Sequence, residues 1–119
     1  MPSILIIDDD EPLRRALRRA LERAGYTVFE APNGAEGMKS WTREHQDLVI
    51  TDIHMPEKDG IEIIIELLRD EPGAKLLVMS GGIDAMGRLD DAKLLGATRT
   101  IAKPFVLDEM LRHVREMTG

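Results

Sequence analysis

Short apolar runs alternate with amphipathic segments five times along the chain. The apolar runs are expected to be strands, and they span residues 4–7, 27–30, 48–51, 76–79 and 100–102. The first, third and fourth runs are almost continuously apolar, which is typical of parallel strands covered on both faces. Five such alternations in a chain of this length predict one α/β domain, a doubly wound parallel sheet with helices on both faces.

Three of the intervening segments carry a helical stripe, in which apolar residues recur every three or four positions. The first stripe is Leu13, Ala16, Leu17, Ala20, Leu21 and Ala24, the second is Ile61, Ile64, Ile65 and Leu68, and the third is Leu107, Met110, Leu111, Val114 and Met117. Residues 35–41 and 86–95 show weaker helical patterns. We expect Trp41, in the first of these two, to be a core residue rather than a ligand contact.

Composition and charge narrow the class of protein. The chain has 119 residues, of which 43% are hydrophobic and 32% charged, so one compact domain with a sizeable core is expected. A net charge of −6 argues against direct binding of nucleic acid. The absence of cysteine excludes disulfides, thiolate metal sites and cysteine nucleophiles. No apolar run is long enough to span a membrane and no signal peptide is evident, so we expect a soluble, cytoplasmic protein.

Three consecutive acids, Asp8, Asp9 and Asp10, follow the first apolar run directly. Two carboxylates about 4 Å apart repel each other by roughly 4 kcal/mol at an effective dielectric constant of ~20. We therefore expect a cation at this position, and an acidic, oxygen-rich site suits Mg²⁺. Asp10 is interpreted instead as the start of the following helix, because acids favour the first helical turn.

Polar residues also follow three other predicted strands. They are Asp52 after the third strand, Ser80 at the end of the fourth and Lys103 after the fifth. Taken singly, they could be a turn cap, a strand-end hydroxyl and a surface lysine. Ligands of open α/β sheets bind beyond the carboxyl ends of the strands, so these side chains should converge with the first acids. Together they could hold Mg²⁺, offer a carboxylate nucleophile to a phosphoryl group, and stabilise the charge on its oxygens.

Five ordered segments carry a family resemblance. They are Ile4-Leu5-Ile6-Ile7-Asp8-Asp9, Asp52-Ile53-His54-Met55-Pro56 with Asp59-Gly60, Met79-Ser80-Gly81, Gly96-Ala97 and Lys103-Pro104-Phe105. With these segments the chain resembles, over essentially its whole length, a response-regulator receiver domain (CheY-like) of two-component signalling. The resemblance implies a flavodoxin-like (βα)5 fold with strand order 2-1-3-4-5. It also implies a single receiver domain over residues 1–119, with no output domain after Gly119.

The resemblance assigns a role to each metal-site residue. Asp52 is expected to be the phosphoacceptor and a ligand of Mg²⁺. Asp9 is expected to bind the ion directly, Asp8 mostly through water, and His54 through its backbone carbonyl. Asp10 falls outside this set.

Two further residues are expected to sense the phosphoryl group. By the same resemblance these are Ser80, through its hydroxyl, and Lys103, through its amine. The Lys103-Pro104 bond is expected to be cis, which suits a tight turn.

The implied function is phosphorylation-dependent signalling. A sensor histidine kinase or a phosphotransfer protein would phosphorylate Asp52 in the presence of Mg²⁺, and the domain would catalyse only its own phosphorylation and dephosphorylation. It would act on a downstream protein, or on an output domain of a longer protein from which it was cut. The readout face would be the fourth helix, fifth strand and fifth helix, a face that could also support a homodimer. No direct contact with nucleic acid or membrane is expected.

One position departs from the usual family pattern, and two others bear on phosphoryl lifetime. Thr100 stands three residues before the lysine, where receiver domains commonly carry Tyr or Phe, and a threonine cannot fill an aromatic pocket. We hypothesise that the switch instead uses the Gly81-Gly82 loop and the glycine-containing helix after it. Gly82 and His54 occupy positions that tune phosphoryl lifetime, and the lack of a side chain at Gly82 favours slow self-hydrolysis.

Three alternative functions were weighed. A Mg²⁺-dependent phosphatase with an aspartyl nucleophile would need a second acid where His54 stands, and a cap domain too large for this length. A flavin or dinucleotide carrier would need a glycine-rich or hydroxyl-rich phosphate loop after the first strand, where acids stand instead. A degenerate receiver that acts only as a docking module would lack a site residue, and none is missing.

Overall fold

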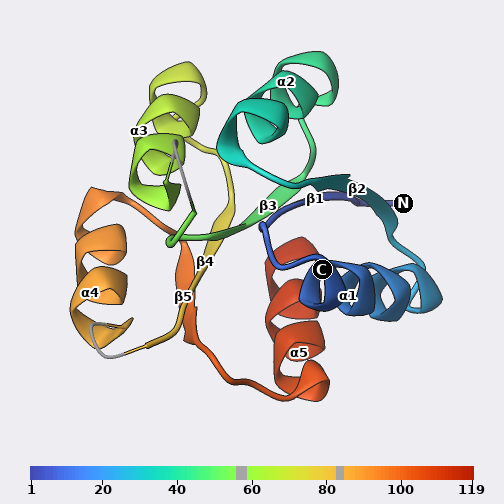
Figure 1. Ribbon diagram of the computed structural model, residues 1–119. Helices are drawn as coiled ribbons and strands as arrows, with labels where there is room; N and C mark the ends of the chain where they lie inside the picture. Colours follow the sequence, from blue (N-terminus) through green and yellow to red (C-terminus); the bar gives the residue numbers. More distant parts are fainter. Residues whose placement is uncertain (56–58, 83–84) are drawn as a thin grey trace.

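The structure is a computed structural model that describes residues 1–55, 59–82 and 85–119. It is a five-stranded parallel sheet with helices on both faces (Figure 1). In chain order the elements are β1 (Ser3–Ile7), α1 (Glu11–Arg23), β2 (Thr27–Ala31), α2 (Gly34–Glu44), β3 (Leu48–Asp52), α3 (Gly60–Asp70), β4 (Leu76–Ser80), α4 (Ala85–Leu95), β5 (Arg99–Ala102) and α5 (Leu107–Thr118). Every predicted strand lies within one of these elements, and every predicted helix corresponds to one, although the first predicted stripe runs one residue beyond α1, to Ala24.

The strands are arranged in the order β2-β1-β3-β4-β5, and every neighbouring pair is parallel. This confirms the doubly wound, flavodoxin-like topology. Helices α1 and α5 cover one face of the sheet, and α2, α3 and α4 cover the other (Figure 1). Among the described residues, no helix combines the length and the apolar character needed to cross a membrane.

Two hydrophobic clusters sandwich the sheet and explain its continuous apolar strands. Successive strand residues point to opposite faces, so in β1 Leu5 and Ile7 join the cluster under α2, α3 and α4, while Ile4 and Ile6 join the cluster under α1 and α5. All four are fully buried. Trp41 is only 2% exposed, which confirms it as a core residue.

The inward face of α3 differs from the sequence prediction. The predicted stripe placed Ile61 and Ile65 inside, but Ile65 is 41% exposed, whereas Ile63 and Leu67 are fully buried. The buried stripe starts at Gly60, whose N–H donates to the Ile53 carbonyl at 3.0 Å. Ile64 of the predicted stripe is fully buried, and Ile61 and Leu68 pack against the same cluster, so the prediction was wrong only for Ile65.

The outer helices are buried along narrower stripes than predicted. In α1, Leu17 and Leu21 are fully buried, but Ala16 and Ala24 are exposed. In α5 the predicted Leu107 is 41% exposed. Each helix covers only one face of the sheet, so one narrow side of the helix is enough to complete the core.

We predict that Gly60→Ala lowers the free energy of unfolding by about 1–3 kcal/mol. A Cβ at this position would lie 2.6 Å from the Asp52 carbonyl oxygen and 2.7 Å from the Ile53 Cα, and backbone atoms cannot move aside as a side chain could. Gly87→Ala in α4 is the matched control. No described heavy atom lies within 4 Å of its added Cβ, so it should stabilise the helix by roughly 0.5–1 kcal/mol. Urea unfolding followed by Trp41 fluorescence measures both changes, and equal effects would contradict the close approach.

Candidate functional site

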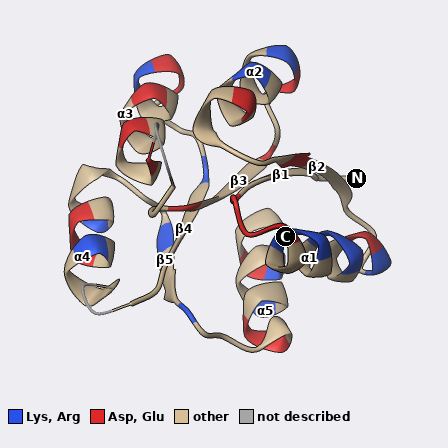
Figure 2. Cartoon of the chain, in the orientation of Figure 1, with Lys and Arg blue, Asp and Glu red and all other residues tan. Residues whose placement is uncertain are grey.

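Three acidic side chains meet at the carboxyl edge of the sheet. Asp8, Asp9 and Asp52 each place a carboxylate oxygen within 4.8 Å of the other two. Asp8 and Asp52 are buried and Asp9 is exposed. Figure 2 shows the acidic segments that follow β1 and β3 near each other at the centre of the molecule. The pairing of β1 with β3 brings together acids that are far apart in the sequence.

The turn after β1 is held by its own side chains. One carboxylate oxygen of Asp8 accepts a hydrogen bond from the Asp10 N–H at 2.9 Å. The Asp10 carboxylate in turn accepts from the Leu13 N–H at 3.2 Å, which makes Asp10 the N-cap of α1. Asp10 therefore starts the helix, as predicted from the sequence.

Lys103 links the acids of both strands. Its ammonium Nζ lies 3.2 Å from Asp8 Oδ2 and 3.2 Å from Asp52 Oδ1, and its side chain is 20% exposed. The Lys103 N–H donates to the Ser80 carbonyl at 2.8 Å, which ties the loop after β5 to the end of β4. The expected cis bond between Lys103 and Pro104 is present. The Lys103 ammonium therefore already places one positive charge between two of the acids.

Burial and charge oppose each other in this cluster. Burial raises the pKa of the Asp8 and Asp52 carboxyls, and the nearby Lys103 only partly offsets this effect. Burial alone would lower the pKa of Lys103, but the two carboxylates outweigh it and the pKa of the amine is raised. Three carboxylates face one ammonium, an excess of two negative charges that a divalent cation would neutralise. This set of hard oxygen donors fits Mg²⁺.

Ser80 ends β4 beside this cluster. Its side chain is fully buried, and its hydroxyl oxygen has no hydrogen-bond partner among the described residues. A buried polar group without a partner costs about 1–3 kcal/mol. The Ser80 hydroxyl would therefore gain stability from donating a hydrogen bond to an acceptor that binds at this edge.

The other residues singled out from the sequence lie around this edge. The His54 side chain is exposed. Its backbone carbonyl remains a predicted ligand, and the motif residue Pro56 lies outside the described residues. Thr100 is half-buried in β5 beside Val78 of β4. Gly82 adopts a φ of 93°, in the left-handed region that favours glycine.

Two residues beside the site, Arg14 and Glu30, received no role from the sequence. Arg14 is only 9% exposed. Its Nε donates to Glu30 Oε1 at 2.9 Å, and its Nη1 donates to the Asp8 carbonyl at 2.8 Å. One signal could have found it, because Arg14 stands three residues before Leu17 and therefore on the inward stripe.

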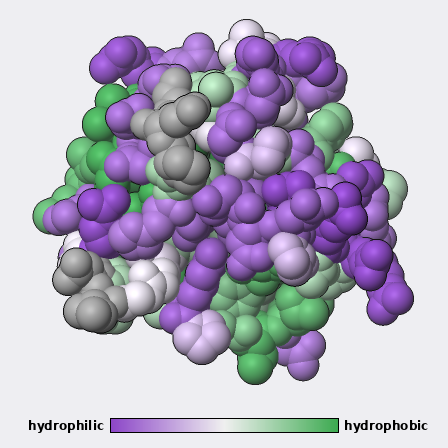
Figure 3. Space-filling model, in the orientation of Figure 1, coloured by the Kyte–Doolittle hydropathy of each residue, from purple (hydrophilic) through white to green (hydrophobic). Residues whose placement is uncertain are grey.

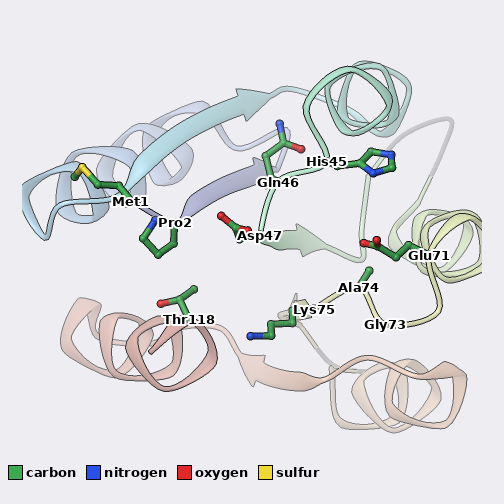
Figure 4. Close-up of a pocket in the computed structure, with 10 residues that line it drawn as sticks. All are labelled: Met1, Pro2, His45, Gln46, Asp47, Glu71, Gly73, Ala74, Lys75 and Thr118. Atoms are coloured by element: carbon green, nitrogen blue, oxygen red, sulfur yellow. The ribbon is translucent and has the colours of Figure 1, made fainter.

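A surface pocket of about 580 Å³ lies at the opposite edge of the sheet (Figure 4). Its lining includes Asp47 and Lys75, whose charges already have partners. Asp47 Oδ2 accepts from the Ser3 N–H at 2.8 Å, and Lys75 Nζ donates to the Met117 carbonyl at 2.7 Å. None of the residues predicted to carry chemistry lines this pocket, so the acidic cluster is the stronger candidate site.

We predict that Asp52→Asn raises the free energy of unfolding at pH 7 in metal-free buffer, on the order of 1 kcal/mol. A raised pKa means that the ionised carboxylate is less stable in the folded chain than in the unfolded chain. The gain should be complete above the raised pKa and disappear as the pH falls below the ordinary carboxyl value of about 3.9. Thermal unfolding across this pH range measures it. Asp90→Asn, at an exposed site on α4, is the control and should give no gain; a loss of stability in Asp52→Asn at pH 7 would contradict the prediction.

The comparison with known proteins covers nearly the whole chain. The family described as the response regulator receiver domain matches residues 4–115. Sporulation initiation phosphotransferase F of Bacillus subtilis is 35% identical over 116 residues, covering 95% of this chain and 90% of that protein. The response regulator receiver protein CpdR of Brucella abortus is 34% identical, covering 98% and 97%. The regulator DctD of Rhizobium meliloti is 33% identical, but the chain spans only 25% of its length.

Solved structures show the same similarity. A response regulator receiver domain protein from Clostridium thermocellum superposes with a TM-score of 0.93 at 26% identity, covering 98% of this chain and 94% of that one. The response regulator TrrA of Thermotoga maritima, solved in complex with Mg²⁺-BeF, superposes with a TM-score of 0.87 at 30% identity, covering 98% and 99%. The fold, the acidic edge of the sheet and these matches agree, and the chain belongs to the response regulator receiver domain family.

Proposed function

We propose that this chain is a phosphorylation-controlled receiver in which Asp52 accepts a phosphoryl group from a histidine kinase or a phosphotransfer protein. One observation carries the proposal: Asp52 shares a cluster with Asp8 and Asp9, and Lys103 bridges Asp8 and Asp52. The relatives support it, since one similar protein is a sporulation phosphotransferase and one similar structure holds Mg²⁺-BeF.

In this proposal, the cluster divides into ligands and charge sensors. Asp9 and Asp52, the backbone carbonyl of His54, and Asp8 through water would hold Mg²⁺. The bound ion would supply positive charge to the transferring oxygens. Lys103 would leave its place between the carboxylates and pair with a phosphoryl oxygen.

The transfer itself exchanges one bond for another. A carboxylate oxygen of Asp52 forms a bond to phosphorus while the bond between phosphorus and the donor's imidazole nitrogen breaks. A donor ring that is protonated on its other nitrogen leaves as neutral imidazole, so atoms and charge balance. Asp52 must be ionised for this step, because a protonated carboxyl group could not attack the phosphorus.

Phosphorylation would then shift a conformational equilibrium. Moving a population from mostly off to mostly on requires about 5.5 kcal/mol of differential interaction. Hydrogen bonds to charged groups contribute about 1.5–3 kcal/mol each. Bonds from Lys103 and from the unpartnered Ser80 hydroxyl would together supply much of the required energy.

The output would be protein contact at the face formed by α4, β5 and α5. Figure 3 shows a hydrophilic centre, with apolar surface at the margins near α4 and α5. Val106 is 69% exposed at the start of α5, and Met86 is 68% exposed on α4. We also propose that residues 1–119 form one receiver domain, working in the cytoplasm through a partner protein or an output domain. A homodimer through the same face is part of this proposal.

We predict that acetyl phosphate and Mg²⁺ add one phosphoryl group to the wild-type chain and none to Asp52→Ala. Intact mass spectrometry measures the adduct. Asp90→Ala, which removes an exposed acid on α4, should be labelled like the wild type, and EDTA should abolish labelling in every sample. An unlabelled wild type that still folds and binds a partner would favour the docking-module alternative.

We predict that phosphorylation changes amide hydrogen exchange at Gly81, Gly82 and the first turn of α4. The loop hypothesis drawn from the sequence covers Gly81 to Arg88, of which residues 83 and 84 lie outside the described residues. Ser80→Ala should still be phosphorylated on Asp52 but should lose part of the exchange response, because the missing hydroxyl cannot bond to the phosphoryl group. Exchange that is unchanged in the phosphorylated wild type would refute the loop as the switch.

A further inference from the structure

The peptide group between Asp8 and Asp9 has a buried partner of its own. The Asp8 carbonyl accepts from Arg14 Nη1 at 2.8 Å, in a contact buried between α1 and the end of β1. Arg14 is itself fixed by Glu30 at the end of β2, whose carboxylate lies 2.9 Å from Arg14 Nε. Arg18 holds the other oxygen of Glu30 at 2.7 Å. A connected network therefore runs from β2 to the turn that carries the acids.

This contact bears on the orientation of Asp9, one of the predicted metal ligands. A peptide group is planar, so fixing its carbonyl also fixes its N–H and the direction in which the next Cα leaves. The Asp8 carboxylate is also held, by the Asp10 N–H and by Lys103, whereas the exposed Asp9 side chain makes no hydrogen bond or ion pair with any described residue. The orientation of Asp9 therefore depends on the backbone that Arg14 holds.

We propose that Arg14 is a positioning residue for the metal site: it fixes the peptide group that joins Asp8 to Asp9, with Glu30 as its anchor. The inference rests on the proposed function, since it concerns the Mg²⁺ site of the same reaction. An arginine is suited to this role because its rigid planar fork presents Nε and Nη1 to two acceptors at once. A lysine would carry the same charge but could not hold both acceptors in that geometry.

The positioning role predicts the direction in which Mg²⁺ affinity changes when Arg14 is replaced. If Arg14 acted only as a nearby positive charge, its removal would reduce repulsion and tighten Mg²⁺ binding. If it positions the ligands, its removal weakens binding although a repelling charge is lost. Changes to groups that orient metal ligands commonly cost 10–100-fold in metal affinity, so we expect Mg²⁺ to bind about tenfold more weakly, or worse.

The experiment titrates Mg²⁺ into the whole chain and follows backbone amide shifts by NMR, which also report whether each variant is folded. Arg14→Met removes the charge and the fork, whereas Arg14→Lys keeps the charge and removes only the fork. Both should bind Mg²⁺ more weakly. Arg18→Met is the matched control, because Arg18 contacts Glu30, does not contact the Asp8 carbonyl, and is 43% exposed; it should bind like the wild type.

Glu30→Gln keeps the test decisive if Arg14→Met fails to fold. This variant leaves Arg14 in place but weakens its anchor, so Mg²⁺ affinity should fall in the same direction by a smaller factor. A merely structural role would lower stability in metal-free buffer and leave the Mg²⁺ affinity of the folded chain unchanged. Equal or tighter Mg²⁺ binding in folded Arg14→Lys would overturn the inference while the phosphorylation of Asp52 stands. A wild-type chain that binds no Mg²⁺ would overturn both.

Discussion

Mutual repulsion among three carboxylates is the constraint around which the carboxyl edge of the sheet is built. The strand order places β1 next to β3, so the carboxylates of Asp8 and Asp52 lie close together at the ends of adjacent strands. Lys103 comes from beyond β5 and reaches across β4 to separate them. One ammonium cannot balance three carboxylates. The fold therefore tolerates a charge imbalance, at a cost in stability, that a divalent cation bound at this edge would relieve.

The two edges of the sheet differ in how their charged groups are satisfied, although the buried Gln46 Oε1 at the amino edge, like the Ser80 hydroxyl, has no hydrogen-bond partner among the described residues. At the carboxyl edge, burial raises the pKa of two acids, and the Ser80 hydroxyl has no partner among the described residues. At the amino edge, Asp47 is bonded to Ser3 and Lys75 to the Met117 carbonyl, so the charges there are already paired. Chemistry is expected where buried charges are unbalanced, because a ligand of opposite charge gains most there. This contrast locates the site better than the size of the surface pocket does.

The sequence was informative wherever a side chain's type decided its position. Continuous apolar strands required burial on both faces, and the strand-end rule was enough to bring Asp8, Asp52 and Lys103 together. Prediction from the sequence failed where the position of a residue depended on a contact with the backbone. Gly60 lies close against the backbone of Asp52 and Ile53, and a hydropathy pattern cannot register this approach because glycine has no side chain. Arg14 received no role from the sequence, because hydropathy scores its charge and does not register the Glu30 carboxylate and the Asp8 carbonyl that accept its hydrogen bonds.

The geometry around Gly81 gives the switch a route that needs no aromatic residue at Thr100. An added Cβ on Gly81 would lie 3.1 Å from the Lys103 Cβ, so the loop after β4 rests directly against the lysine stem. The Lys103 N–H also donates to the Ser80 carbonyl, one residue before Gly81. In the proposed switch, a shift of Lys103 toward a phosphoryl group on Asp52 would therefore be felt by the loop that packs against its stem. Gly82, at a φ of 93°, comes next in the chain after Gly81.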